Sequence, residues 1–269
     1  MKKIINYLVK NKEVARDNIA TLLYRLNLIP QEYKGRVRAI YKSKLYAKDF
    51  KKLKLKHNIN GFYQLDPMPS KEFLNKYYLD TYWQSRTDKQ YPIRLRDIEH
   101  YKLLKKMFSK FDETPKNILN FGAGHGGLSF FLHTAKHHIY NYEPGGIKQY
   151  FSNRWESVEK LDQTKIKFDL IYGSHTLEHV QNINETLNLF NKISHDKTIF
   201  FFEVPNCFDK ANQKIEPPHT YYFTRKFFYN FFLNCEYCKT FKNYLEQKGD
   251  EGEVIILLSQ SKINEELIK

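Results

Sequence analysis

Three residues with acid–base side chains lie within five positions of one another, in the stretch "GSHTLEHV": His175, Glu178 and His179. If this stretch begins a helix, His175 and His179 lie one turn apart on one face, with Glu178 beside them. An imidazole beside a carboxylate can remove the proton of a weakly acidic hydroxyl. The same side chains can also bind a divalent metal. The pattern leaves three interpretations open: a general base, with His179 as the first candidate, a metal site, and a structural pair that caps the helix.

A second candidate for proton transfer is His219, in the stretch "EPPHTYYF". Two prolines precede it, which predicts a rigid loop. The loop follows the apolar run at 197–205, so chain order places the histidine at the same cleft as the first group. It can orient or deprotonate an acceptor, and it can equally be a plain hydrogen-bonding residue.

The stretch "NFGAGHGGLSFFL" holds four of the chain's eleven glycines directly after a short apolar run. Glycines between a strand and its helix let a ligand approach the backbone closely. We therefore expect Gly122, Ala123, Gly124 and Gly126 to contact a cofactor. The next apolar run ends at Glu143, whose carboxylate can accept hydrogen bonds from both ribose hydroxyls of an adenosine-type cofactor. By themselves these residues suit NAD and S-adenosylmethionine alike.

Alternating apolar and amphipathic segments must position these residues. The run at 197–205 is continuously apolar, which is typical of a strand buried on both faces. The alternation predicts an α/β fold with a doubly wound parallel sheet and helices on both faces. The predicted strands are 117–122, 137–143, 167–173, 197–205 and 252–260, and the predicted helices of this part are 128–135, 183–193 and 224–233.

The first part of the chain has a different character. Apolar spacing predicts an amphipathic helix at 12–29, stopped by Pro30, and a further helix at 36–57. Two prolines in "QLDPMPSKEF" mark the best boundary. We therefore expect residues 1–66 to form a basic, mainly helical N-terminal extension and residues 67–269 to form one Rossmann-like domain, with preceding helices in 70–111 and the sheet core in 115–260.

Several of these stretches, in this order, make the chain similar to the class I S-adenosylmethionine-dependent methyltransferases. The resemblance covers about residues 73–260, and residues 1–60 fall outside it. Two features depart from the family pattern: Asn120 replaces the usual acidic residue before the first glycine, and the third-strand region near "WESVEKL" is degenerate, which leaves the adenine contact unplaced. The motifs that carry the resemblance are "ILNFGAGHGG", "YNYEP", "FDLIYGSHTLEHV", "IFFFEVPN" and "PHTYYFTRKFFYNFF".

The resemblance implies a seven-stranded sheet with a reversed final hairpin and S-adenosylmethionine bound over the carboxyl ends of the strands. It implies that the loop after the fourth strand lies near the methyl group, so we expect Ser174 to contact the cofactor. Tyr82 is a candidate lid. Some quinone-pathway relatives hold a metal in this loop, which keeps His175, Glu178 and His179 as an alternative metal site.

The final segment resembles a branch that acts on small molecules and bacterial glycans. The expected function is therefore O-methylation of a small-molecule acceptor, most simply a carbohydrate: a sugar or a glycan-precursor hydroxyl, with a histidine as general base. The loop after the fourth strand argues against a nicotinamide-dependent oxidoreductase. A catalytically degenerate protein that only binds the cofactor stays open.

The formal net charge of +14 is concentrated at one end of the chain. Residues 1–60 carry 16 Lys and Arg against 4 Asp and Glu, and the remaining residues carry a net charge of only +2. A basic arm suits a nucleic acid, so an RNA methyltransferase is the main alternative function, although lysine-rich composition alone gives the same excess. No apolar run is long enough to span a membrane, and we expect a cytoplasmic protein. The N-terminal helix can pair two copies into a homodimer.

Overall fold

The computed structural model describes residues 42, 46, 48–82, 93–144, 155–206, 215–241 and 254–268. The chain divides into two compact units, residues 1–53 with 70–90 and residues 54–69 with 91–269. The helix predicted at 12–29 lies outside the described residues. In the first unit, helix α4 (Lys71–Tyr77) begins at Ser70, whose Oγ accepts a hydrogen bond from the amide of Phe73.

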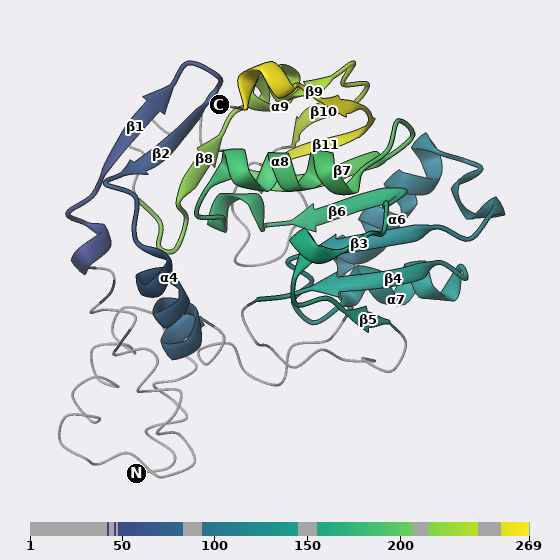
Figure 1. Cartoon of the computed structure of the whole chain (residues 1–269), viewed down its shortest axis with the longest axis horizontal. Coiled ribbons are helices and arrows are strands. Elements are labelled where there is room, and N and C mark those ends of the chain that lie inside the picture. Colours follow the sequence, from purple (N-terminus) through teal and green to yellow (C-terminus); the bar gives the residue numbers. More distant parts are fainter. Residues whose placement is uncertain are drawn as a thin grey trace, which may run out of the picture. The chain divides into compact units, whose positions relative to one another are not determined.

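The second unit is built on a seven-stranded sheet in the order β10-β11-β7-β6-β3-β4-β5 (Figure 1). Strands β7, β6, β3, β4 and β5 are parallel, whereas β11 runs antiparallel to both β7 and β10. This confirms the predicted α/β fold and the reversed final hairpin. The strands are β3 (Asn117–Phe121), β4 (His138–Tyr142), β5 (Glu156–Ser157), β6 (Leu170–Ser174), β7 (Ile199–Pro205), β10 (Cys238–Phe241) and β11 (Val254–Gln260).

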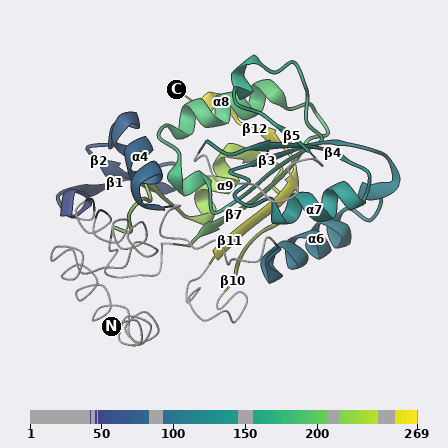
Figure 2. The same ribbon diagram turned by 90° about the horizontal axis from the view of Figure 1, so that it is seen from below.

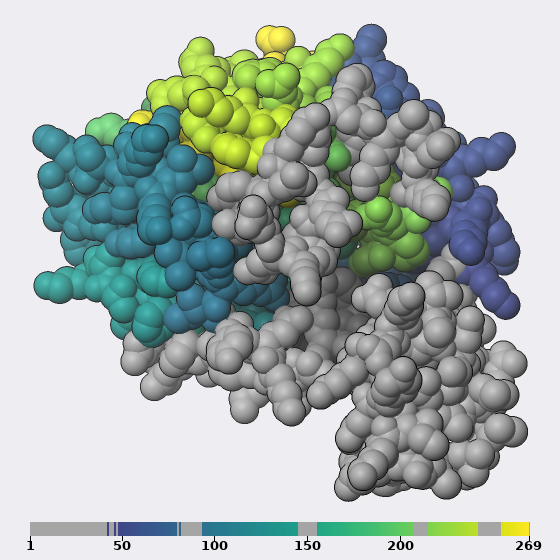
Figure 3. Space-filling view, turned by 180° about the vertical axis from the view of Figure 1, so that it is seen from behind, coloured from purple at the N-terminus to yellow at the C-terminus, as the bar shows by residue number. Residues whose placement is uncertain are grey.

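Helices cover both faces of this sheet (Figure 2). Alternate residues of β7 explain why: Phe200 and Phe202 pack with α8 (Ile183–Ile193) and α9 (Arg225–Phe231), while Phe201 packs on the opposite side with α6 (Leu95–Met107) and α7 (Gly127–Thr134). Both faces of the strand are therefore apolar, as its sequence predicted. Figure 3 views the molecule from the side of α6 and α7.

Helix α6 lies within 70–111, where helices were predicted. Its first residue, Leu95, is apolar but 48% exposed. The fully buried positions are His100 and Leu104, which are four residues apart and so share one face. A polar side chain thus occupies the buried face of the helix, and its partners form part of the site described below.

A second, three-stranded sheet corrects the expectation for the N-terminal region. Residues predicted to end a helix at 57 instead form β1 (Lys54–Asn58), which pairs antiparallel with β2 (Phe62–Asp66). Strand β2 in turn pairs with β8 (Tyr221–Phe223), in the register Phe62 to Phe223. The hairpin therefore belongs to the second unit, because its hydrogen-bonding partner is a strand near the C-terminal end of the chain.

The turn of this hairpin requires a glycine. Gly61 has a φ of +97°, and a Cβ there would lie 2.5 Å from the amide nitrogen of Phe227.

Within the described residues, no helix combines the length and the apolar character needed to cross a bilayer.

Candidate active site

The predicted glycine loop connects β3 to α7 and is tightly packed. Gly122, Gly124 and Gly126 have φ values of +72°, +54° and +83°, a region that residues with a Cβ rarely adopt. A Cβ on Gly122 would lie 2.3 Å from Oγ1 of Thr176, and one on Gly126 would lie 2.8 Å from the ring of Trp155. Glycine therefore occupies the positions where the backbone has a positive φ and where a Cβ would clash. The loop packs directly against the turn that follows β6.

Glu143 lies beside this loop, just after β4. Its Oε2 accepts a hydrogen bond of 2.8 Å from the amide of Gly124, while the amides of Gly122 and Ala123 donate to the carbonyl of Tyr142. The residues of the loop are buried or half-buried, and Glu143 can still accept hydrogen bonds from ribose hydroxyls through its second carboxylate oxygen. The predicted cofactor residues on the loop and Glu143 therefore lie together, and their contacts with the cofactor stay a prediction.

Asn120, the departure from the family pattern, ties three elements together. Its Nδ2 donates to Oγ of Ser129 on α7 at 2.8 Å, and that hydroxyl donates to Oδ1 of Asn141 on β4 at 2.6 Å. All three side chains are buried. The asparagine thus links β3, α7 and β4 beneath the glycine loop with neutral groups, so this end of the site needs no buried charge.

The turn after β6 differs from the predicted helix start. Leu177–His179 is a single 3-10 turn, and His175 has a φ of +52°. His175 and His179 are therefore not stacked on one helical face. Instead, Thr220 holds the turn: its amide donates to the carbonyl of Glu178 at 2.7 Å, and its Oγ1 donates to the carbonyls of Glu178 and Val180. Because Thr220 directly follows His219, these hydrogen bonds position His219 beside the turn that contains Glu178 and His179.

Glu178, His179 and His219 form one compact group. The rings of the two histidines are 4.8 Å apart, and Nε2 of His179 is 3.7 Å from Oε1 of Glu178. Within the described residues, this trio offers one ligand atom from each side chain, all within 4.8 Å of one another. These three predicted catalytic residues are in contact with one another, the fourth, His175, contacts Glu178 from its other side, and His219 takes the place of His175 in the candidate metal set.

The charges in this group follow from burial and pairing. Burial alone would raise the pKa of Glu178, but the coulombic interaction with the imidazole of His179 and the pairing with His175 outweigh it and lower the pKa to about 2. Burial lowers the pKa of His219, an effect that Glu178 and Glu216 only partly offset. At neutral pH the group therefore pairs an ionised carboxylate with a neutral His219.

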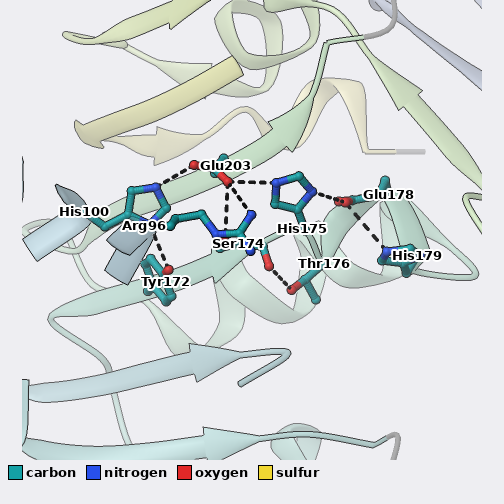
Figure 4. Close-up of polar contacts among 9 residues, drawn as sticks. All are labelled: Arg96, His100, Tyr172, Ser174, His175, Thr176, Glu178, His179 and Glu203. Carbon is teal, nitrogen blue, oxygen red and sulfur yellow. Dashed lines mark hydrogen bonds and ion pairs between the residues drawn. The ribbon is translucent and has the colours of Figure 1, made fainter. Parts of the chain in front are cut away.

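His175, the fourth predicted residue, bridges two carboxylates (Figure 4). Its Nδ1 lies 3.3 Å from Oε1 of Glu178, and its Nε2 lies 2.8 Å from Oε1 of Glu203. Burial opposes a charge on this ring, but the two carboxylates prevail and raise the pKa of His175 to about 9. A ring that carries both protons at neutral pH pairs with the two carboxylates, and the predicted catalytic role of His175 stays a prediction.

Glu203 on β7 is the centre of a wider buried network that sequence reasoning missed (Figure 4). Its side chain is 1% exposed. Oε1 accepts from Nη1 of Arg96 at 3.1 Å and from Oγ of Ser174 at 3.3 Å, and Oε2 accepts from Nε2 of His100 at 2.6 Å. Burial would raise the pKa of Glu203, but the contacts with His100 and His175 outweigh it and hold the pKa well below its ordinary value, so the carboxylate is ionised.

A tyrosine completes the network on the far side of His100. Oη of Tyr172 lies 3.0 Å from Nδ1 of His100. Burial raises the pKa of Tyr172 well above its ordinary value, so the hydroxyl keeps its proton and can donate it to Nδ1. That leaves Nε2 of His100 as the donor to Glu203.

The missed residues left one usable signal in the sequence. Glu203 interrupts the otherwise apolar run "KTIFFFEVP", and a charge in a strand buried on both faces requires partners. Ser174, predicted to contact the cofactor, is one of those partners. The other prediction, Tyr82, ends a π-helical turn in the first unit, and its contact with the cofactor stays a prediction.

Comparisons with known proteins agree with this geometry. A family model described as "Methyltransferase domain" matches residues 93–234, which is more than half of the chain. No curated protein matches the chain. Many solved structures do.

Three of these solved structures illustrate the likeness. A putative methyltransferase from an antibiotic biosynthesis pathway of Anabaena variabilis is 12% identical, with a TM-score of 0.34 over 42% of this chain and 48% of that one, so the chain spans about half of that protein. A putative S-adenosylmethionine-dependent methyltransferase from Listeria monocytogenes is 11% identical, with a TM-score of 0.42 over 61% and 98%. Magnesium protoporphyrin IX methyltransferase from Synechocystis, solved with bound SAH, is 12% identical, with a TM-score of 0.45 over 65% and 90%.

The matched region begins just before α6 and ends just after α9, so it contains the glycine loop, Glu143 and the whole charged network. The match indicates S-adenosylmethionine as the cofactor, as the sequence predicted. With its glycine loop, seven-stranded sheet and matched domain, the chain belongs to the methyltransferase-domain family.

Proposed function

We propose that the chain is an O-methyltransferase that moves the methyl group of S-adenosylmethionine to a hydroxyl of a small-molecule acceptor, a sugar or glycan precursor, with His179 as general base. The observation that carries the proposal is the position of the Glu178–His179–His219 group. The turn that holds this group also contains Thr176, which packs against Gly122 of the glycine loop. The acid–base group and the cofactor loop are therefore neighbours.

The cofactor supplies a methyl group that is already activated on a sulfonium. Gly122, Gly124 and Gly126 would admit its amino-acid end to the backbone, and Glu143 would hold the ribose hydroxyls. What the chain must then supply is alignment of the acceptor and removal of a proton, because a sugar hydroxyl is a weak acid.

The proton would go to His179. In this scheme S-adenosylmethionine would supply the activated methyl group, and the neutral imidazole of His179 would accept the proton of the acceptor hydroxyl and become positively charged. The ionised carboxylate of Glu178, 3.7 Å from Nε2, stabilises that charge. His219, uncharged at neutral pH because burial lowers its pKa, would orient the acceptor hydroxyl.

A metal-assisted form of the same reaction is the second candidate. Two histidines and a carboxylate, with ligand atoms within 4.8 Å of one another, match the donor types of a divalent transition-metal site. The two forms differ in a simple measurement. Overnight dialysis against a chelator abolishes turnover in the metal-assisted form, with recovery on metal addition, and leaves turnover intact when His179 acts alone.

The test of the proposal is an acceptor screen with methyl-labelled cofactor, beginning with nucleotide sugars and surface-glycan intermediates and including RNA. With the acceptor in hand, His179→Gln should lower kcat about a hundredfold and leave the affinity for S-adenosylhomocysteine unchanged. The exposed His138, at the start of β4, provides the matched control His138→Gln. Full activity of the His179 variant would show that His179 is not the general base. Label found only in RNA would show that the acceptor is a nucleic acid and not a sugar or glycan precursor.

A further inference from the structure

The carboxylate of Glu203 is deeply buried and accepts contacts from several side chains, which suggests a specific role. It lies on an apolar strand, and its side chain is 1% exposed. An ionised carboxylate in such a place is strongly unfavourable unless donors surround it. Here four side chains from two elements and one turn supply those donors: Arg96, His100, Ser174 and His175.

The anchor of this carboxylate is helix α6. Arg96 and His100 are four residues apart, so both project from one face of the helix toward β7. Glu203 is also fixed through its backbone, because its carbonyl accepts from the amide of His175 at 2.8 Å. The side chain and the main chain of the same residue thus both hold His175, which has a φ of +52°.

On the other side, Glu178 depends on His175 for its direction. Among the described residues, neither carboxylate oxygen of Glu178 makes a well-formed hydrogen bond. Its contacts are the ion pairs with His175 at 3.3 Å and His179 at 3.7 Å. Because Glu178 is 1% exposed, these two ion pairs are the polar contacts that fix the direction of its carboxylate among the described residues.

We propose that Glu203 is a positioning residue for methyl transfer: anchored by Arg96 and His100, it holds His175 between two carboxylates and so directs Glu178 toward His179. This rests on the proposed function, in which His179 is the base. Glu203 itself touches neither cofactor nor acceptor in this scheme. Its effect reaches the reaction through His175 and Glu178, in contrast to a carboxylate that only stabilises the fold.

The test compares Glu203→Gln, His175→Asn and the double variant. Asparagine suits position 175 because it tolerates a positive φ, and that variant leaves the contacts of Glu203 with α6 intact, so it can fold even if Glu203→Gln cannot. Each single variant should lower kcat 10- to 100-fold, with the KM for the acceptor and the affinity for S-adenosylhomocysteine changed by less than about threefold. The double variant should be no slower than the slower single variant, because both substitutions break the same chain of contacts.

Lys102→Ala, on the exposed side of α6, is the matched control and should keep wild-type kcat. Unchanged kcat in folded His175→Asn, or effects that multiply in the double variant, would overturn the positioning role. A loss confined to thermal stability would do the same.

A second measurement separates this inference from the proposed function. In protein with ¹³C-labelled histidine, the ring resonance of His179, assigned from its absence in His179→Gln, should move in His175→Asn and in Glu203→Gln but not in Lys102→Ala. If the wild type methylates no hydroxyl acceptor, the proposed function fails, and this resonance still decides the inference. A His179 resonance that keeps its wild-type position in both variants would refute the positioning role of Glu203.

Discussion

The two ends of the candidate site are built by opposite means. Beneath the glycine loop, Asn120, Ser129 and Asn141 join three elements through neutral hydrogen bonds, and the loop itself relies on glycine backbone. At the turn after β6, buried charges alternate instead, from Glu203 through His175 to Glu178. Steric fit is therefore the critical property where the cofactor is expected, and charge is critical where the proton is expected to move. Substitutions that disturb the steric fit should affect stability and cofactor binding, whereas substitutions that remove a charge should affect kcat.

The largest effect should come from shape. Gly122→Ala forces a Cβ to within 2.3 Å of Thr176 at a φ of +72°, so we expect a loss of about 4 kcal/mol in the free energy of unfolding and loss of measurable S-adenosylhomocysteine binding. Thermal denaturation and titration calorimetry measure the two. Adding Thr176→Gly should recover part of the stability, because it relieves the clash but not the backbone strain. Wild-type binding in the single variant would show that the loop has room to adjust.

The next effect should come from charge alone. Glu178→Gln keeps the shape of the side chain but removes the carboxylate that stabilises a protonated His179, so we expect kcat to fall about a hundredfold, which corresponds to about 2.7 kcal/mol. Cofactor affinity should not change, in contrast to Gly122→Ala. Steady-state kinetics against Glu113→Gln, an exposed control, checks this. If Glu178→Gln lost cofactor binding as Gly122→Ala is expected to, the cofactor end and the proton-transfer end of the site would not be independent.

A third prediction concerns pH. The pKa of His175 is raised to about 9 in the folded chain, so its pairing contributes stability that is complete below the unfolded value of about 6.5 and is lost as the pH rises through about 9. The wild type should therefore exceed His175→Asn by about 2 kcal/mol near pH 6, and the difference should shrink toward pH 10. Denaturant unfolding at a series of pH values measures it. A difference that is the same at every pH would assign the effect to packing.

The smallest effect should be at the neutral network. Asn120→Ala removes one buried hydrogen bond, for an expected loss of about 1 kcal/mol that does not depend on pH. Ser129→Ala should cost a similar amount, and the double variant less than the two together, because they share a bond. Denaturant unfolding at two pH values distinguishes this behaviour from that of His175. A pH-dependent loss would indicate a hidden charge.

The sequence predicted the sheet better than it predicted the site. The continuous apolar run 197–205 was confirmed as the buried strand β7. Gly122 lies at a positive φ against Thr176, and its predicted contact with the cofactor stays a prediction. The contacts of Glu203 with Arg96 and His100 join residues more than 100 positions apart, and no local pattern encodes such a pairing. The charge of His175 could not be predicted from its local sequence either, because it depends on a carboxylate from a different strand. Its catalytic role stays a prediction.

The hairpin β1–β2 limits how the chain can be shortened. The matched family region begins at residue 93, yet β8 pairs with β2, and the amide of Leu65 donates to the carbonyl of Thr220, the residue next to His219. An expression boundary drawn at the family limit would delete β1 and β2 and leave β8 without its partner strand in the three-stranded sheet. The loop that carries His219 would then lose one of its supports, so a minimal fragment designed from the family match alone should begin no later than residue 54.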